Sequence, residues 1–410
     1  MLKCFSKCCL KTSNALKNYK ISFYLTLFIL VPLLLFTRCK DKVTDPDPGS
    51  ISTESFSANY STSDSKLLIG VCYYPWYTNG QHWNSTYMRA KLNPPQPPLL
   101  GEYDLAAAKI ISQHVEWSVD SKIDFWISSW WGPGSSTDNV ILMSQLNNND
   151  FLSSMGYCLL YESSGRFGGL PINVDSNKIS TFLTDIEYLI ENHFHHSNYM
   201  KIDNKPVLYL YLTRTLSGNY KDLFNAADSL LMQNGYDGLY VVGDEVYWSS
   251  PNTSRARYMD AISCYNPHTS VDWVTNADKF VSRTGTDMYM PWMDKANDLG
   301  ISFWVDVLPG FNDLGVRKEA NHPVIERKDG AVFNKMLLMA GDVLSNQTIP
   351  LKVLVITSFN EWHEDTQIEP TIVTSKLDND PFTYTDGFGY IGYGMKYLDA
   401  VKSFAESYGN

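Results

Sequence analysis

The sequence has little positive charge once its first residues are set aside. It contains 33 Lys and Arg against 44 Asp and Glu over 410 residues, a formal net charge of −11. Six of the basic residues precede Cys39, which leaves 27 against 44 in the remainder, a balance of −17. A body this acidic repels phosphate backbones, so nucleic acid is not an expected partner.

Cysteine is also scarce. Four of the seven cysteines lie within the first 39 residues, and Cys72, Cys158 and Cys264 are well separated inside apolar runs. This spacing excludes a disulfide framework, and it favours small side chains buried in strands. No CxxC pair is present, and we interpret the histidine cluster at 193–196 as surface, so we expect no metal site.

Aromatic residues are abundant instead. The 11 Trp, 26 Tyr and 19 Phe are more than a core requires, and flat rings are used to stack on sugar faces. An oligo- or polysaccharide is therefore the expected partner. With 44% apolar and 19% charged residues the chain has ample material for one large domain and is not generally disordered.

The amino terminus has the pattern of a targeting segment. Five lysines precede an apolar run at 21–36, which would reach about 24 Å as a helix and falls short of the roughly 30 Å hydrocarbon layer. The run is followed by Arg38 and Cys39, and this junction resembles a bacterial lipoprotein processing site with Cys39 as the lipidated residue, although a small residue is usual in place of Arg38. The alternative is a signal anchor that keeps the basic tail in the cytoplasm.

Three segments follow from this reading. Residues 1–38 are predicted to be a signal peptide or signal anchor, 39–65 a flexible tether rich in Asp, Ser, Thr and Pro, and 66–410 a single folded domain. Both readings export the body and attach it to a membrane. The first places it on the cell surface or periplasmic face of a bacterium, the second as a type II membrane protein.

From residue 67 the chain alternates short apolar runs with longer amphipathic stretches. The runs are rich in Val, Ile, Tyr and Phe, which suits strands buried on both faces. They cover 67–74, 125–130, 156–161, 207–212, 238–243, 260–265, 302–308 and 351–357. Helices are expected at 105–121, 140–155, 178–192, 220–234, 273–298 and 331–344.

Eight strand–helix repeats imply parallel pairing and predict an α/β fold, a single (β/α)8 TIM-type barrel. The connection at 244–260 leaves room for only a short helix. An open doubly wound sheet is the alternative, but no GxGxxG motif follows the first run.

In such a barrel, reactive side chains are expected at the carboxyl ends of the strands. Aromatic residues and carboxylates do gather there. Tyr74 ends the first run and Trp76 follows it, Trp130 ends the second, Glu162 follows the third, and Tyr209 lies in the fourth. Their combination predicts a cleft for a glycan.

Glu361 and Glu364 form the sharpest feature, because they follow directly on a buried strand and are framed by Trp362 and His363. Their spacing is expected to place both carboxylates on one side of a helical turn, within about 6 Å at Cβ. Glycoside cleavage commonly uses a proton donor beside a second carboxylate, with unlike pKa values set by burial and neighbours.

The run TSFNEWHEDTQIEP at 357–370 resembles the signature of glycoside hydrolase family 99, the endo-α-mannosidases and endo-α-1,2-mannanases. The resemblance implies a retaining endo-hydrolase acting on mannan or N-glycan-type substrates without metal or cofactor. Glu361 would deprotonate the substrate 2-hydroxyl, which attacks the anomeric carbon and gives a 1,2-anhydro sugar. Glu364 would be the general acid and then the base for water.

The resemblance also suggests substrate contacts. Glu162 matches a carboxylate near the cleavage point, and Asn360 would orient the sugar or the base. Further candidates for the subsites are Tyr74, Trp76, Tyr209, Trp130, His363 and Arg317. Asp365 stands where the family pattern has glycine, and Pro75 alters the first-strand motif, which together suggest an outlying member.

Two alternatives stay open at this point. One is a surface lipoprotein that binds glycans on the same barrel without cleaving them. The other is a glycosidase of different sugar specificity that uses another pair, such as Glu162 with Asp306. The sequence carries no signal for an oligomeric state.

Overall fold

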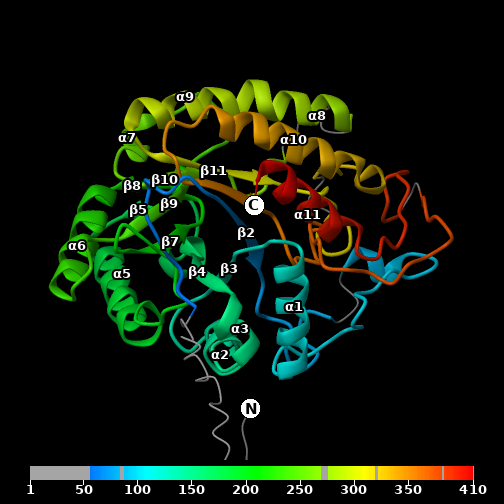
Figure 1. The fold of residues 1–410 in the computed structure, drawn as a ribbon, viewed down its shortest axis with the longest axis horizontal. Helices are drawn as coiled ribbons and strands as arrows, with labels where there is room; N and C mark the ends of the chain where they lie inside the picture. The colour runs from blue at the N-terminus through cyan, green and yellow to red at the C-terminus, as the bar shows by residue number, and fades with distance from the viewer. Residues whose placement is uncertain (1–55, 84–86, 269–275, 319–321, 381–382, 410) are drawn as a thin grey trace, which may run out of the picture. The chain divides into compact units, whose positions relative to one another are not determined.

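The computed structural model describes residues 56–83, 87–268, 276–318, 322–380 and 383–409. Its centre is a closed ring of eight parallel strands (Figure 1). They are β2 Leu67–Tyr73, β3 Phe125–Trp130, β4 Gly156–Tyr161, β7 Lys205–Leu210, β9 Tyr240–Asp244, β10 Ala261–Ser263, β11 Ser302–Val307 and β12 Lys352–Ile356. β12 pairs with β2, and β7 pairs with β9, so the ring closes. The predicted (β/α)8 barrel is confirmed.

The eight strands coincide with the eight predicted runs because both of their faces are buried. β2, β3, β4, β9, β10 and β11 are buried at every position. One face of each strand packs against the helices, and the other fills the barrel. Gly70 makes room for an interior ring, since a Cβ there would lie 2.3 Å from Phe125.

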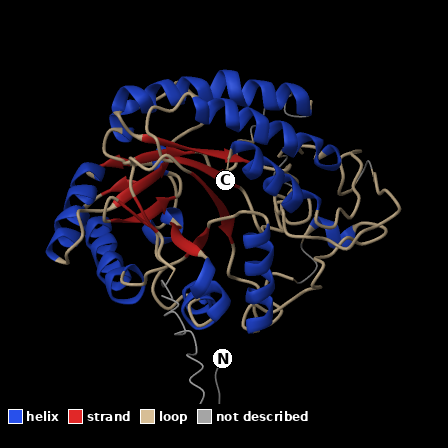
Figure 2. Ribbon diagram, viewed as in Figure 1, coloured by secondary structure: helices blue, strands red, loops and turns tan. Residues whose placement is uncertain are grey.

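Helices surround the strands, as Figure 2 shows in blue around the red strands. The main ones are α1 Ala108–Asp120, α5 Ser176–Leu189, α6 Tyr220–Gln233, α9 Met290–Leu299, α10 Ala331–Ser345 and α11 Lys396–Tyr408. Shorter ones are α2 Ser136–Val140, α3 Asn149–Ser154, α4 Ser163–Phe167, α7 Thr253–Ala256 and α8 Ala277–Arg283. Short strands also pair at the edges of the barrel: β5 Asn173–Val174 with β8 Ser217–Gly218, and β1 Asn59–Tyr60 with β6 Lys201–Ile202.

Two predicted helices are interrupted. The one expected at 140–155 is divided by a turn at Asn148, whose side chain accepts from the Phe151 N–H and caps α3. The one expected at 273–298 is divided into α8 and α9 by a π-helical segment, Thr284–Tyr289, and its first three residues lie outside the described part. The short connection at 244–260 holds the single-turn α7, as predicted.

The tether was predicted to extend to residue 65, but its last ten residues belong to the folded unit. β1 pairs with β6, Ala58 is fully buried, and the Thr62 hydroxyl donates to Asp203 Oδ2 at 2.7 Å. The polar composition of this segment suggested a tether, but its polar side chains form hydrogen bonds with residues at the amino ends of the barrel strands. Residues 1–55, with the predicted signal and most of the tether, lie outside the described residues.

The three body cysteines are fully buried, as predicted. The histidine cluster at 193–196 was interpreted as surface, and this is wrong for His193, which is fully buried with Nε2 3.1 Å from Asp138 Oδ1. In the described part of the chain, no helix is both long enough and apolar enough to cross a membrane.

Candidate active site

The carboxyl ends of the strands enclose a cavity of about 180 Å³. Its lining joins residues from six strand ends and from the loop after β11. They are Tyr74, Trp76, Trp131, Leu160, Glu162, Ser164, Tyr211, Tyr265, Arg317, Glu361 and Glu364. Three carboxylates therefore meet at the end of the barrel where parallel-barrel enzymes carry their chemistry.

The loop after β12 delivers Glu361 and Glu364 to the cavity. Ser358 Oγ accepts from the Glu361 N–H at 2.8 Å, and a tight turn follows at 362–365 in place of the expected helical turn. Asp365 ends the turn with a φ of 49°, in the left-handed region that favours Gly, Asn and Asp. This conformation accounts for the glycine that the family pattern has at that position.

Glu361 is buried and is held through a single oxygen. The His363 N–H donates to Glu361 Oε1 at 2.9 Å, and His363 Nδ1 lies 3.2 Å from the same oxygen. The other ring nitrogen, Nε2, lies 3.0 Å from the carbonyl oxygen of His82. His363, predicted to contact substrate, thus contacts the carboxylate.

Glu364 is held by different partners. Arg317 Nη1 donates to its Oε1 at 2.8 Å, and Asn266 Nδ2 lies 3.4 Å from Oε2. Burial and the neighbouring Glu361 charge raise the pKa of Glu364, and Arg317 opposes them. Glu364 therefore keeps a proton more readily than an ordinary glutamate does.

Glu162 is the third carboxylate of the cavity. The Ser129 hydroxyl donates to its Oε1 at 2.7 Å, and Trp131 Nε1 donates to the same hydroxyl oxygen at 3.1 Å. Burial raises the pKa of Glu162 to about 7, and the charges of Glu361 and Glu364 add to this effect. Glu162 therefore titrates near neutral pH.

Aromatic side chains form much of the cavity wall. The Tyr74 and Tyr265 hydroxyls share a hydrogen bond, and the Tyr74 ring lies 4.6 Å from that of Trp76. Trp131 is 43% exposed, which is unusual for a side chain of this size and suits stacking on a sugar. Trp76 Nε1 is buried without a partner among the described residues, so it can donate to a ligand.

Three other predicted residues lie outside the cavity. Both ends of the Asn360 amide bond to the Tyr74 backbone, at 2.7 and 3.1 Å, so Asn360 is a fully buried link between strand ends. Tyr209 is fully buried within the barrel. Trp130 is also fully buried and donates to Asp138 at 2.7 Å.

The neighbours of these residues do line the cavity. Trp131 replaces Trp130 in that role, and Tyr211 replaces Tyr209. Asp306, considered as an alternative partner of Glu162, is fully buried and accepts from the Thr357 hydroxyl at 2.7 Å without lining the cavity.

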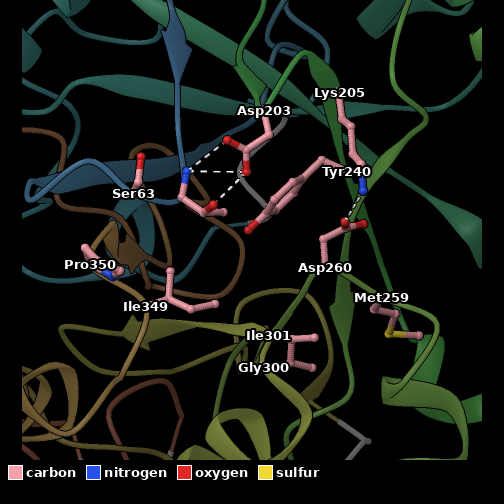
Figure 3. A pocket seen from close by; sticks show the side chains of 11 residues that line it. Ser63, Asp203, Lys205, Tyr240, Met259, Asp260, Gly300, Ile301, Ile349 and Pro350 are labelled. Atoms are coloured by element: carbon pink, nitrogen blue, oxygen red, sulfur yellow. Dashed lines mark hydrogen bonds and ion pairs between the residues drawn. The ribbon is translucent and has the colours of Figure 1, made fainter.

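A second cavity, of about 450 Å³, lies at the amino ends of the strands. Lys205 and Asp260 point toward one another there, 2.7 Å apart (Figure 3). Asp203 accepts from Thr62. Because these charged groups satisfy one another, and because this end of a parallel barrel serves stability, we place the chemistry in the smaller cavity.

The class of protein follows from the smaller cavity. The cavity contains carboxylates with different surroundings, set among aromatic rings at the carboxyl end of a parallel barrel. This arrangement is typical of a glycoside hydrolase. A family model described as glycosyl hydrolase family 99 matches residues 66–408. The chain belongs to this family and is a glycoside hydrolase with a saccharide substrate.

Relatives support the assignment. The glycoprotein endo-alpha-1,2-mannosidase of Xenopus laevis is 24% identical over 377 residues, 83% of this chain and 77% of that protein. A glycoprotein endo-alpha-1,2-mannosidase-like protein of Mus musculus is 24% identical over 339 residues, 73% of this chain and 68% of that protein.

Solved structures share the fold. The family 99 endo-alpha-mannosidase of Bacteroides thetaiotaomicron has a TM-score of 0.59 at 21% identity, covering 85% of this chain and 99% of that one. A glycoside hydrolase-like protein has a TM-score of 0.62 at 19% identity, covering 88% and 97%.

Proposed function

We propose that the chain is an exported, retaining endo-glycosidase that hydrolyses α-mannosidic linkages in mannan or N-glycan-type substrates. The mannosidase names of its relatives support the sugar. The observation that carries the chemistry is that Glu361 and Glu364 line one cavity with different partners, His363 for the first and Arg317 for the second.

In the first step Glu361 takes the proton of the substrate 2-hydroxyl. The freed oxygen attacks the anomeric carbon, the glycosidic C–O bond breaks, and Glu364 gives its proton to the leaving oxygen. The products are a 1,2-anhydro sugar and a shortened glycan. The raised pKa of Glu364 suits the donor, since a group of this kind must be protonated near its working pH.

In the second step water attacks the anomeric carbon of the anhydro sugar. Glu364, now ionised, takes the proton of that water, and Glu361 returns its proton to the 2-oxygen as the epoxide opens. Each step inverts the anomeric carbon, so the configuration is retained overall. Both glutamates end in their starting protonation states, as turnover requires.

Substrate contacts are assigned to the cavity wall. Glu162 would accept hydrogen bonds from sugar hydroxyls, with Trp76 donating and with Tyr74 and Trp131 supplying faces for the rings. Their support is that all four line the cavity. Arg317 also lines the cavity, but its guanidinium group is bound to Glu364, so we expect it to contribute little direct contact with the substrate.

Export and attachment belong to the same proposal. The basic and apolar pattern before Cys39 supports a lipoprotein whose Cys39 carries the lipid, with a signal anchor as the competing outcome. Cys39→Ser in the cell tests this. A lipoprotein loses its lipid-modified form and its processing, whereas a signal-anchored chain keeps its unprocessed length and its place in the membrane fraction.

The enzymatic proposal is tested with the full chain on a panel of α-mannans and glucosylated mannosides. We expect oligosaccharides of two or more sugars, released with retained configuration, and a loss of about 10²-fold or more in Glu361→Gln and Glu364→Gln. Glu116→Gln, at an exposed helix position, is the matched control. Release of monosaccharide alone contradicts endo action, and binding of the panel by an inert wild type supports a glycan-binding protein.

A further inference from the structure

Both ring nitrogens of His363 face oxygen atoms. Nε2 lies 3.0 Å from the His82 carbonyl oxygen, which can only accept a hydrogen bond, so Nε2 carries hydrogen. Nδ1 lies 3.2 Å from Glu361 Oε1. When Glu361 is ionised this oxygen also can only accept, so Nδ1 carries hydrogen as well, and the ring is an imidazolium.

The surroundings of His363 favour this charged form. Burial opposes it, but the hydrogen bond and attraction from Glu361 outweigh burial, with the His82 carbonyl and Glu364 adding, so the pKa of His363 is raised. The neighbouring His82 ring lies 5.5 Å away, and burial together with His363 lowers the pKa of His82. The positive charge of the histidine pair therefore resides on His363.

The same contacts fix the carboxylate. The backbone N–H and Nδ1 of His363 both approach Oε1, and among the described residues no hydrogen-bond donor contacts Oε2. The His363 ring packs beside the rings of Trp76 and Tyr77, with centroids 5.9 and 6.1 Å away. Glu361 thus has one anchored oxygen and one oxygen available to a ligand.

We propose that His363 is a positioning residue, a permanent cationic partner that keeps Glu361 ionised and aims Oε2 at the hydroxyl proton of the sugar. This rests on the proposed role of Glu361 as base, and it replaces the prediction that His363 binds substrate. During the first step the proton moves from the 2-hydroxyl to Oε2, while both hydrogens of the His363 ring stay in place. Its charge offsets that of the carboxylate before transfer, so burying Glu361 beside two other acids is less costly.

The first test uses ¹⁵N-labelled histidine in the full chain and does not depend on turnover. His363→Asn identifies the signals of His363 by their loss. We expect both ring nitrogens to carry hydrogen at neutral pH in the wild type, and the ring to lose its extra proton at lower pH in Glu361→Gln. A neutral ring in the wild type at pH 6.5, or a titration unmoved by Glu361→Gln, overturns the proposal.

The second test is kinetic and applies once a cleaved glycan is known. His363→Asn keeps an N–H group near Glu361 without the charge, and His363→Phe keeps the packing against Trp76 without any donor. We expect kcat to fall about 10- to 100-fold, more in Phe than in Asn, with KM nearly unchanged. A rise of KM with kcat intact in both variants means substrate contact and overturns the proposal. If the wild type cleaves no glycan but its His363 ring is doubly protonated, the proposed function is wrong and the charged state of His363 still stands.

Discussion

Replacing Asp365 by Asn should destabilise the fold more than any other single change of charge near the site. Asp365 is 1% exposed and is shared by two buried arginines. Arg89 Nε lies 2.5 Å from Oδ1, and Arg327 Nε lies 3.0 Å from Oδ2. Two cations thus meet one anion. Their other partners are uncharged: Gln96 and backbone carbonyls accept hydrogen bonds from them, and the rings of Tyr390, Tyr393 and Tyr397 lie nearby.

Removing the one negative charge leaves both guanidinium groups buried and mutually repelling. Breaking a buried pair of this kind costs about 3–5 kcal/mol, a large share of a total stability of about 5–15 kcal/mol. With an unfolding entropy of about 2.1 cal/mol/K per residue over about 350 residues, the loss corresponds to a fall in Tm of about 4–7 °C. Asp365→Gly should lose as much, because a relaxed backbone does not restore the charge.

The assay is thermal and urea unfolding of Asp365→Asn beside Asp329→Asn. Asp329 has nearly the same backbone conformation, with a φ of 48°, but is exposed and pairs with Lys396 at the surface. We expect the Asp329 variant to lie within about 1 kcal/mol of wild type. Adding Arg89→Met to Asp365→Asn should cost less than the sum of the single changes, since it removes one unpaired cation. Equal losses in the two Asp variants, or strict additivity with Arg89→Met, would refute this account.

Three further predictions concern the cavity. Arg317→Met should raise the pKa of Glu364 further and move the alkaline limb of hydrolysis to higher pH. The effect should be modest because the Arg317 side chain is 47% exposed, and an unmoved limb in the pH profile contradicts the prediction. Folded Glu162, with a pKa raised from 4.5 to about 7, keeps a proton that the unfolded chain releases, so stability should fall by up to about 3 kcal/mol as pH rises through that window. Between pH 4.5 and 7.5, the unfolding free energy of Glu162→Gln should depend less on pH than that of the wild type. An identical pH dependence in the two proteins rules out this role of Glu162. Trp131→Ala should raise KM about 3- to 10-fold with little change in kcat, and Trp131→Phe should restore most of the affinity, whereas a pure loss of kcat speaks against stacking.

The sequence predicted the barrel because each strand is buried on both faces and is therefore a continuous apolar run. The same property hides the direction of each side chain. Trp130 and Trp131 are neighbours that point to opposite sides, and a run without polar alternation does not show which one faces inward. Tyr209 and Tyr211 share one side of the chain, but only the later one reaches the cavity, because β7 ends at Leu210.

Long-range contacts were the other part that local pattern could not supply. The arginines that hold Asp365 come from residues 89 and 327, far from it in the chain. The interruptions within helices were not predicted for a related reason. The turn at Asn148 is set by a capping side chain inside an otherwise helical stretch, and its amide also reaches back to the Ala108 carbonyl.

The three carboxylates of the cavity differ less in their burial than in what holds them, and the proposed roles follow from this difference. Glu162 has a neutral hydroxyl as its partner and keeps a proton near neutral pH. Glu364 has an arginine that is half exposed, which limits but does not cancel the effect of burial. Glu361 alone has a histidine, His363, that holds one of its oxygens through both the ring and the backbone N–H. Among the three acids of the cavity, Glu361 is thus the one whose oxygen is aimed by its partner, and this is what abstraction of a hydroxyl proton requires.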